Sequence, residues 1–241
     1  MSIIMVRAFR DRLLAILIAL TLPTLVAAEG LRVTPVVLEV PSPGSATTLT
    51  LKNESKAPLT VQARVFRWTQ QDSAERLERT SDVVVSPPAV QLPPGAMQTV
   101  RVIRTAGAPV RGEEAYRIVI NEIPDQSRRS AGAVAFVTEL RIPVFFAAAD
   151  VRVPDVLWTL RQSNNATWLV AVNRGDSRLR LADLQLQGAS GAKVSHQGLL
   201  GYVLGGASMQ WPIASAGRLG GTARLRAITN VGPLDTGVAS Q

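Results

Sequence analysis

The stretch from Val134 to Phe146 constrains the fold most, because large apolar side chains alternate along it with a mixed, partly charged set. Successive side chains of an extended chain point to opposite faces, so this alternation predicts a long β-strand. Most strands in globular proteins have about five or six residues. Two interpretations stay open: a buried strand of a β-sandwich, or a strand that pairs with another protein. The row on one face consists of Val134, Phe136, Thr138, Leu140, Ile142, Val144 and Phe146.

The surroundings of this strand indicate a domain boundary. A basic, polar segment, Asp125–Gly132, precedes the strand, and a short alanine-rich joint, Ala147–Ala149, follows it. The length of the chain is sufficient for two domains of ordinary size. We therefore predict a first domain over residues 29–148 and a second over residues 149–241.

The first 28 residues have the parts of a secretory signal peptide. An apolar run, Leu13–Ala27, ends in small residues that form a cleavage site before Glu29. The run is shorter than the ~18–20 residues that a membrane-spanning helix needs. We expect cleavage and export without stable membrane insertion, with a retained anchor as the alternative. The basic residues before the run are Arg7, Arg10 and Arg12.

From Leu31 onward the pattern is that of β-structure, without a convincing amphipathic helix. Short apolar segments are separated by turn signals at about 8–12-residue spacing, which predicts an antiparallel, immunoglobulin-like sandwich. A charged connection is expected at Ser73–Asp82. The main strands predicted in the first domain are Val33–Val40, Thr47–Lys52, Leu59–Thr69, Gln98–Arg104 and Ala115–Ile123.

The same kind of pattern returns after the joint, although the two halves show no obvious repeat in their residues. Glycines separate the segments of this second, smaller unit. The predicted strands are Leu157–Leu160, Ala166–Asn173, Arg178–Leu186, a piece at Val194, Leu199–Leu204, Met209–Ile213 and Ala223–Thr229. The predicted fold class is therefore all-β with two sandwich domains.

Catalytic and metal chemistry is hard to build from this composition. The chain has one histidine, His196, and no cysteine, so a transition-metal site of the usual kind is not expected. There is no nucleophile elbow and no glycine-rich phosphate loop. We expect no enzymatic activity, no metal and no cofactor. The formal charge is +8, but the basic residues are scattered without interleaved aromatics, so no nucleic-acid partner is expected.

A set of short motifs, taken in order, resembles the periplasmic pilus (fimbrial) chaperones of the chaperone–usher pathway. Single motifs are weak, but their order and spacing cover nearly the whole chain after the signal. In the first domain the motifs are Val33-Thr34-Pro35-Val36, Leu51-Lys52-Asn53, Leu92-Pro93-Pro94-Gly95, Glu113-Glu114-Ala115-Tyr116-Arg117, Asn121-Glu122-Ile123-Pro124 and Arg141-Ile142-Pro143-Val144-Phe145-Phe146. In the second they are Asn173-Arg174-Gly175, Gly201-Tyr202-Val203-Leu204-Gly205-Gly206, Trp211 and Asn230-Val231-Gly232.

The resemblance implies a fold and a mechanism. Such chaperones have two immunoglobulin-like sandwiches in a boomerang arrangement, and they lend a long edge strand to a pilin that lacks its last strand. The resemblance implies periplasmic pilus subunits and an outer-membrane usher as partners, and it leaves self-association of the free protein open. It favours the partner-binding interpretation of the long strand. The donated row would be Val134, Phe136, Thr138, Leu140 and Ile142.

The chain departs from the family pattern at the site that holds the carboxylate of the subunit. Classical members use an Arg on the first strand and a Lys on the donor strand, where this chain has Pro35 and Pro143. Such departures resemble the alternative and archaic branches of the family. Proline supplies neither a charge nor a donor. Other arginines are therefore candidates for the anchor, unless the anchor is absent. In order of preference they are Arg117, Arg141 and Arg32.

Two other classes of protein remain as alternatives. One is an exported two-domain module that binds protein or carbohydrate, for which exposed aromatic residues at loop tips would be expected. The other is a pilus subunit or adhesin, which would carry an alternating N-terminal extension and a single incomplete sandwich.

Overall fold

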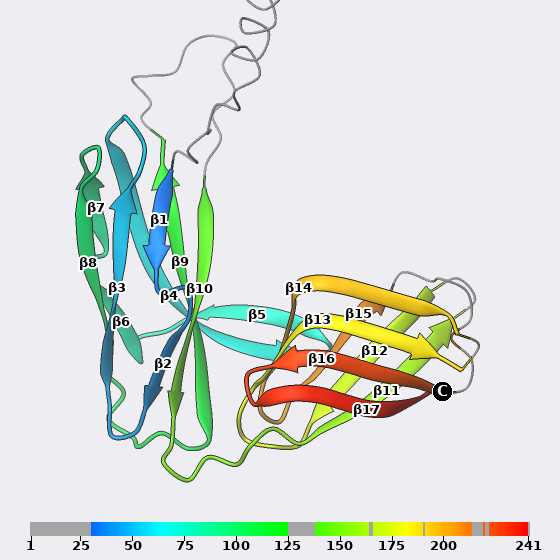
Figure 1. Ribbon diagram of the computed structural model, residues 1–241. Helices are drawn as coiled ribbons and strands as arrows, with labels where there is room; N and C mark the ends of the chain where they lie inside the picture. The colour runs from blue at the N-terminus through cyan, green and yellow to red at the C-terminus, as the bar shows by residue number, and fades with distance from the viewer. Residues whose placement is uncertain are drawn as a thin grey trace, which may run out of the picture. The chain divides into compact units, whose positions relative to one another are not determined.

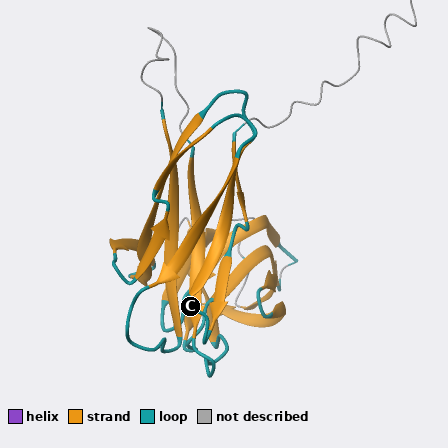
Figure 2. Cartoon of the chain, turned by 90° about the vertical axis from the view of Figure 1, so that its left-hand side faces the viewer, coloured by secondary structure: helices purple, strands orange, loops and turns teal. Residues whose placement is uncertain are grey.

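The described part of the chain is built from β-strands. The computed structural model describes residues 30–124, 138–163, 166–189, 191–213, 219 and 222–240. Within these ranges every regular element is a strand, as Figure 2 shows, and no helix is long and apolar enough to cross a membrane. Leu31–Gln241 forms one compact unit. The predicted all-β class is therefore confirmed.

The first sandwich contains strands β1 to β10 in two sheets (Figure 1). One sheet has the order β1-β3-β8-β6, and the other has the order β2-β10-β9-β4-β5, with β7 paired to β4. The strands are β1 Leu31–Thr34, β2 Leu38–Pro41, β3 Ala46–Asn53, β4 Leu59–Gln71, β5 Ala74–Arg79, β6 Val83–Ser86, β7 Ala89–Leu92, β8 Met97–Arg104, β9 Glu113–Ile123 and β10 Glu139–Ala147.

The second sandwich contains β11 to β17 in one continuous path, β14-β13-β16-β17-β11-β12-β15. β11 and β17 pair in parallel at Thr159 and Leu160 only, so this short contact joins two layers that face each other. The strands are β11 Val156–Ser163, β12 Ala166–Asn173, β13 Leu179–Gly188, β14 Lys193–Val203, β15 Ser208–Ile213, β16 Thr222–Thr229 and β17 Gly232–Ser240.

Alternating apolar residues fill the core of each sandwich, as the period of a strand requires. In the first sandwich, Leu49 and Leu51 of β3 face Ile118 and Ile120 of β9 within one buried cluster. In the second, β16 buries every second residue over its whole length. Neither core contains a disulfide, because the chain has no cysteine. Burial of apolar surface is therefore the main stabilising contribution.

Several predicted strands differ from the observed ones. Val33–Val40 is interrupted at Pro35 and forms β1 and β2, which join different sheets. Ser73–Asp82, expected as a connection, contains β5, because β4 continues to Gln71 and a two-residue turn with positive φ at Asp72 and Ser73 starts a hairpin.

In the second sandwich, strands that contain glycines were predicted wrongly. The pieces at Val194 and Leu199–Leu204 belong to one strand, β14, in which Gly198 and Gly201 adopt positive φ beside an irregular register with β13. β17 was not predicted at all, since Gly232, Pro233 and Gly237 are poor strand formers. Cross-strand pairing with β16 decides its conformation.

A buried asparagine closes the same turn in both sandwiches. Asn53, at the end of β3, donates to the carbonyls of Ala57 and Leu92 and accepts from the amide of Ser55. Asn173, at the end of β12, donates to Ser177 and Val203 and accepts from the amide of Gly175.

In each sandwich the same asparagine also contacts a second turn, which precedes β8 in the first sandwich and β15 in the second. The backbone amide of Asn53 donates to Ala96, and that of Asn173 donates to Ala207. Gly95 and Gly206, which immediately precede these alanines, both have positive φ. The two sandwiches therefore share a local hydrogen-bonding arrangement, although their sequences show no obvious repeat.

Candidate functional site

Part of β10 is an open sheet edge. Along its whole length, from Glu139 to Ala147, β10 pairs antiparallel with β9. On its other side it pairs with β2 only at Val144–Ala147. Among the described residues, Glu139–Pro143 therefore has a strand on one side and none on the other. Unpaired backbone groups of this kind are a template for another strand.

The described part of the predicted subunit-binding row divides into two environments. Thr138 is partly buried, and its carbonyl accepts from the amide of Glu122 at 3.1 Å. Leu140 is partly buried against the first core. Ile142 is only 5% exposed and belongs to that core, so its own sandwich holds this side chain instead of presenting it to a partner. Val134 and Phe136 lie outside the described residues.

Arg117 lies opposite Pro143 in the register of β9 and β10. Its guanidinium stacks on the ring of Trp68, with the central carbon 3.7 Å from the ring centroid, and lies 5.7 Å from the ring of Tyr202. One terminal nitrogen contacts Glu75 at 3.3 Å. The side chain is 12% exposed, and its Nε is buried without a hydrogen-bond partner among the residues that the structure describes.

Burial lowers the pKa of Arg117 from its ordinary value, and the nearby Glu75 carboxylate opposes this shift. An arginine remains charged in such surroundings. The site thus holds a cation with a buried donor that has no acceptor. A buried donor without a partner is unfavourable by about 1–3 kcal/mol, so an incoming acceptor would be stabilised there.

The other two candidate arginines lie at the surface. Arg141 is 58% exposed and donates to Glu139, its neighbour on the same strand, at 2.8 Å. Arg32 is also exposed and contacts Glu54 at 3.4 Å. Exposed ion pairs contribute little, because water and salt screen them. The structure thus separates Arg117 from Arg141 and Arg32 by burial.

The surroundings of Arg117 include residues from both sandwiches. Trp68, Phe145 and Tyr202 form an aromatic group, with ring centroids 5.4 Å apart for Trp68 and Tyr202 and 5.8 Å apart for Trp68 and Phe145. Gln70 adds two buried hydrogen bonds, one to the carbonyl of Tyr202 and one from the amide of Leu204.

A second arginine, Arg178, also joins the two sandwiches. It stacks on Phe145 at 3.6 Å and forms ion pairs with Glu113 and Glu39. Its backbone amide donates to Glu113 as well. Burial raises the pKa of Glu113 from its ordinary value, and the charge and hydrogen bonds of Arg178 counteract this effect. Arg178 is committed to these contacts, whereas Arg117 keeps a donor free.

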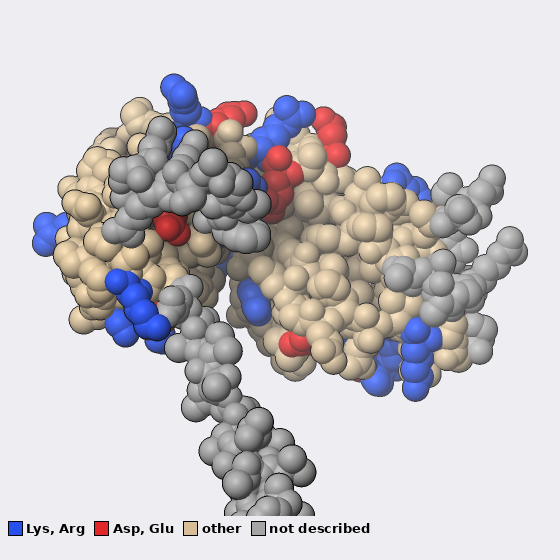
Figure 3. Space-filling model, turned by 90° about the horizontal axis from the view of Figure 1, so that it is seen from above, with Lys and Arg blue, Asp and Glu red and all other residues tan. Residues whose placement is uncertain are grey.

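Sequence reasoning did not find Gln70 or Arg178. Both are polar residues within strand patterns, and their partners lie far away in the sequence, so no local signal marks them. Trp68 falls within the predicted strand Leu59–Thr69, and no local signal marks its contact with Arg117. Among the described residues there is no cluster of side chains that could hold a metal ion. On the face seen in Figure 3, acidic and basic side chains lie in small neighbouring groups.

Comparison with known proteins identifies the family. The sequence model of the pili and flagellar-assembly chaperones, PapD N-terminal domain, matches residues 30–151. This match covers half of the chain, so the chain belongs to the family of pili and flagellar-assembly chaperones. Chaperones of this family are periplasmic and non-enzymatic. No sequence of a curated protein matches the chain.

Solved structures of pilus chaperones share the fold. A chaperone–tip adhesin pre-assembly complex of archaic Csu pili of Acinetobacter baumannii matches with a TM-score of 0.68, 20% identity, and coverage of 88% of this chain and 99% of that chain. The complex of SafA pilin with the SafB chaperone of Salmonella enterica matches with a TM-score of 0.60 and 19% identity, and the match covers 89% of this chain and 99% of that chain. The E. coli chaperone DraB matches with a TM-score of 0.57 and 21% identity, and the match covers 88% of this chain and 96% of that chain. The predicted pair of immunoglobulin-like sandwiches is thus confirmed.

Proposed function

We propose that this chaperone captures pilus subunits by adding its edge strand to an incomplete subunit sandwich. The observation that carries the proposal is the open edge of β10 at Glu139–Pro143, which has β9 on one side only. Pairing with a subunit strand would satisfy backbone groups on both partners. Complexes of related chaperones with a tip adhesin and with a pilin support this type of partner.

The side chains presented to the subunit would come from the beginning of the predicted row. Val134, Phe136 and Thr138 precede the part of the row that the core of the first sandwich takes up, and Leu140 lies at the transition. Alternate apolar side chains of an added strand fill pockets that would otherwise remain empty, which avoids the cost of a cavity. Covering an open groove also suppresses edge-to-edge aggregation of the subunit.

Arg117 is the proposed anchor for the terminal carboxylate of the subunit. Its position across from Pro143 brings a cation next to the place where family members carry a lysine, and its Nε lacks an acceptor. A carboxylate can accept two parallel hydrogen bonds from one guanidinium. Arg141 and Arg32 remain secondary candidates, since both are exposed and already paired.

The remaining steps follow from the pathway. The proposal includes export by a cleaved signal over residues 1–28, domains over residues 29–148 and 149–241, and delivery of the subunit to an outer-membrane usher. Self-association of the free chaperone through the same edge would compete with capture of the subunit. Salt should disrupt such self-association less than it disrupts exposed ion pairs, because backbone pairing carries no net charge.

Co-expression of the chaperone with a pilus subunit tests the proposal. We expect Phe136→Asp/Leu140→Asp to abolish co-purification of the subunit, because charged side chains cannot fill apolar pockets. Met97→Asp is the matched control, since Met97 is 69% exposed on β8 and should tolerate a charge. Co-purification that persists in the double variant, with an unchanged circular dichroism spectrum, would contradict strand addition at this edge.

A further inference from the structure

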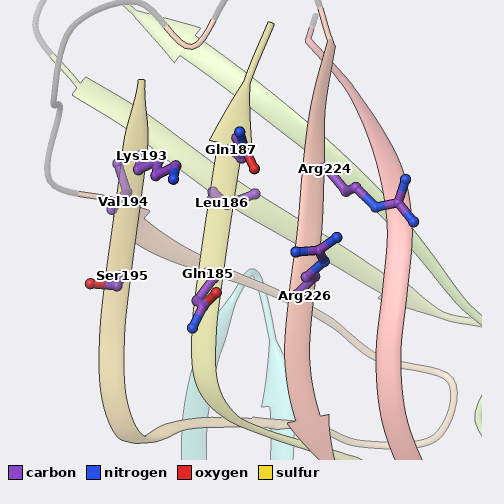
Figure 4. Close-up of a pocket in the computed structure, with 8 residues that line it drawn as sticks. All are labelled: Gln185, Leu186, Gln187, Lys193, Val194, Ser195, Arg224 and Arg226. Atoms are coloured by element: carbon purple, nitrogen blue, oxygen red, sulfur yellow. The ribbon is translucent and has the colours of Figure 1, made fainter. Parts of the chain in front are cut away.

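A polar hollow lies on the second sandwich, over neighbouring strands that the capture of subunits does not involve. Its volume is about 220 Å³, and β13, β14 and β16 contribute its walls (Figure 4). The strand register places the lining side chains in two rows. Gln187 pairs with Lys193 on one side and Arg224 on the other, and Gln185 pairs with Ser195 and Arg226.

The charges of this hollow are unbalanced. Arg224 donates to Asp235 through two nitrogens, at 2.6 and 3.0 Å, and Arg226 donates to the same carboxylate at 3.2 Å. These hydrogen bonds lower the pKa of Asp235, and the one from Arg224 has the largest effect. The cluster therefore holds three cations and one carboxylate. One carboxylate cannot neutralise it, and a net charge of about +2 remains near neutral pH.

Several donors in the hollow have no protein acceptor among the described residues. Arg226 uses only its Nε for Asp235, so both of its terminal nitrogens are available. No hydrogen bond or ion pair of the Lys193 ammonium occurs within the described ranges, and Figure 4 shows Lys193 leaning from β14 toward Gln187. Gln185 and Gln187 lie on β13, between the two strands that carry these cations.

We infer that this hollow binds a phosphate group. Lys193 and Arg226 lie on the strands on either side of β13, opposite residues two positions apart along it, so their backbones are about 12 Å apart. A tetrahedral oxyanion between two long side chains fits this span. A phosphate dianion would balance the remaining charge, and it offers more acceptor oxygens than a carboxylate to the amides, ammonium and guanidinium.

A phosphate group could come from two sources, a soluble phosphate ester or the headgroup of an anionic phospholipid. The chemistry at the protein is the same in both. The binding step would be independent of β10 and of subunit capture, because none of the lining residues belongs to the first sandwich. Failure of the phosphate site would therefore leave the proposed chaperone function untouched.

Isothermal titration calorimetry of the full chain with inorganic phosphate tests this inference. We expect saturable binding, with affinity reduced at least tenfold in Lys193→Gln/Arg226→Gln. The control is Arg76→Gln/Arg101→Gln, which removes the same charge from exposed positions of the first sandwich. It should bind phosphate like the unaltered protein. Thermal unfolding checks that all variants are folded.

Flotation with vesicles separates the two sources. Binding to vesicles that contain phosphatidylglycerol, lost in Lys193→Gln/Arg226→Gln and absent with phosphatidylcholine alone, would identify a lipid headgroup. Binding of free phosphate without vesicle binding would identify a soluble ester. No saturable binding in either assay, or equal losses in the control and the site variant, would overturn the inference.

Discussion

Arg117 and Pro143 face each other across the antiparallel pair of β9 and β10. Opposed residues in such a pair have Cα atoms about 4.5–5.5 Å apart. Arg117 therefore lies on the strand next to Pro143, at the same level of the sheet. Stacking on Trp68 fixes the plane of its guanidinium.

This relationship predicts the effect of changing Arg117. We expect Arg117→Ala to weaken binding of a purified subunit by roughly tenfold or more, equivalent to about 1.4 kcal/mol. Arg117→Lys should recover only part of the affinity, since an ammonium lacks the planar fork. Surface plasmon resonance with immobilised subunit provides the measurement. Arg141→Ala and Arg32→Ala test the two secondary candidates and should weaken binding less. Unchanged affinity in all three alanine variants would mean that strand pairing alone holds the subunit.

The shared turn predicts that replacing its buried asparagine destabilises the protein equally in either sandwich. Asn53 and Asn173 are almost completely buried, and each satisfies backbone groups that would otherwise lack partners. We expect Asn53→Ala and Asn173→Ala each to lower the free energy of unfolding by ~2–3 kcal/mol. Urea titration measures this change. Asn230→Ala serves as a comparison, because Asn230 is exposed and makes one exposed and one long, half-buried hydrogen bond, so it should contribute clearly less.

The hydrogen bonds of Gln70 are expected to stabilise the contact between the two sandwiches. Gln70→Met keeps the length of the side chain but removes both hydrogen bonds to β14 and the residue that follows it. We expect faster hydrogen exchange at the amide of Leu204, and a loss of ~1–3 kcal/mol in stability. Gln62→Met, on the same strand, is the control because no side-chain hydrogen bond of Gln62 occurs within the described ranges. Unchanged exchange at Leu204 would contradict the assigned contact.

The half-buried ion pair of Arg104 and Glu114 predicts that the stability of the protein depends on pH. Two nitrogens of Arg104 donate to Glu114 at 2.8 and 2.9 Å, and this interaction, with help from Tyr116, lowers the pKa of Glu114. A carboxyl group with a lowered folded-state pKa stabilises the fold above its unfolded pKa of ~4.3. That contribution disappears as the pH falls through the folded pKa.

The corresponding experiment compares urea unfolding at pH 7 and pH 3. The unaltered protein should lose more stability on acidification than Glu114→Gln, because the variant has no charge to lose. At pH 7 Glu114→Gln should itself be destabilised by ~1–2 kcal/mol, since the half-buried Arg104 loses its ionic partner. Glu78→Gln, at an exposed position of β5, should follow the unaltered protein at both pH values.

The N-terminal segment predicts the mass of the exported protein. The apolar run and the small residues before Glu29 indicate that the exported form begins at Glu29. Intact-mass spectrometry of protein from the periplasmic fraction measures this directly. A mass that includes residues 1–28, together with retention in the membrane fraction, would show that the segment is a permanent anchor.

The sequence by itself determined the class of the fold. Period-two alternation is a local property of each segment, so β3, β8 and β12 were predicted within one residue of their observed ends. Where local preference and pairing disagree, the prediction failed. β17 contains two glycines and a proline, and hydrogen bonds to β16 impose its extended form.

Only the tertiary structure decided which residues meet. The alternating row from Val134 to Phe146 could not reveal where it passes from a free edge into a core, because Leu140 and Ile142 have the same parity as the residues before them. Likewise, the sequence could rank Arg117 first among the candidate anchors but could not show that it is buried. Its burial depends on Trp68 and on Tyr202 from the second sandwich. Such contacts join positions far apart in the chain, and they exist only after both sandwiches have folded.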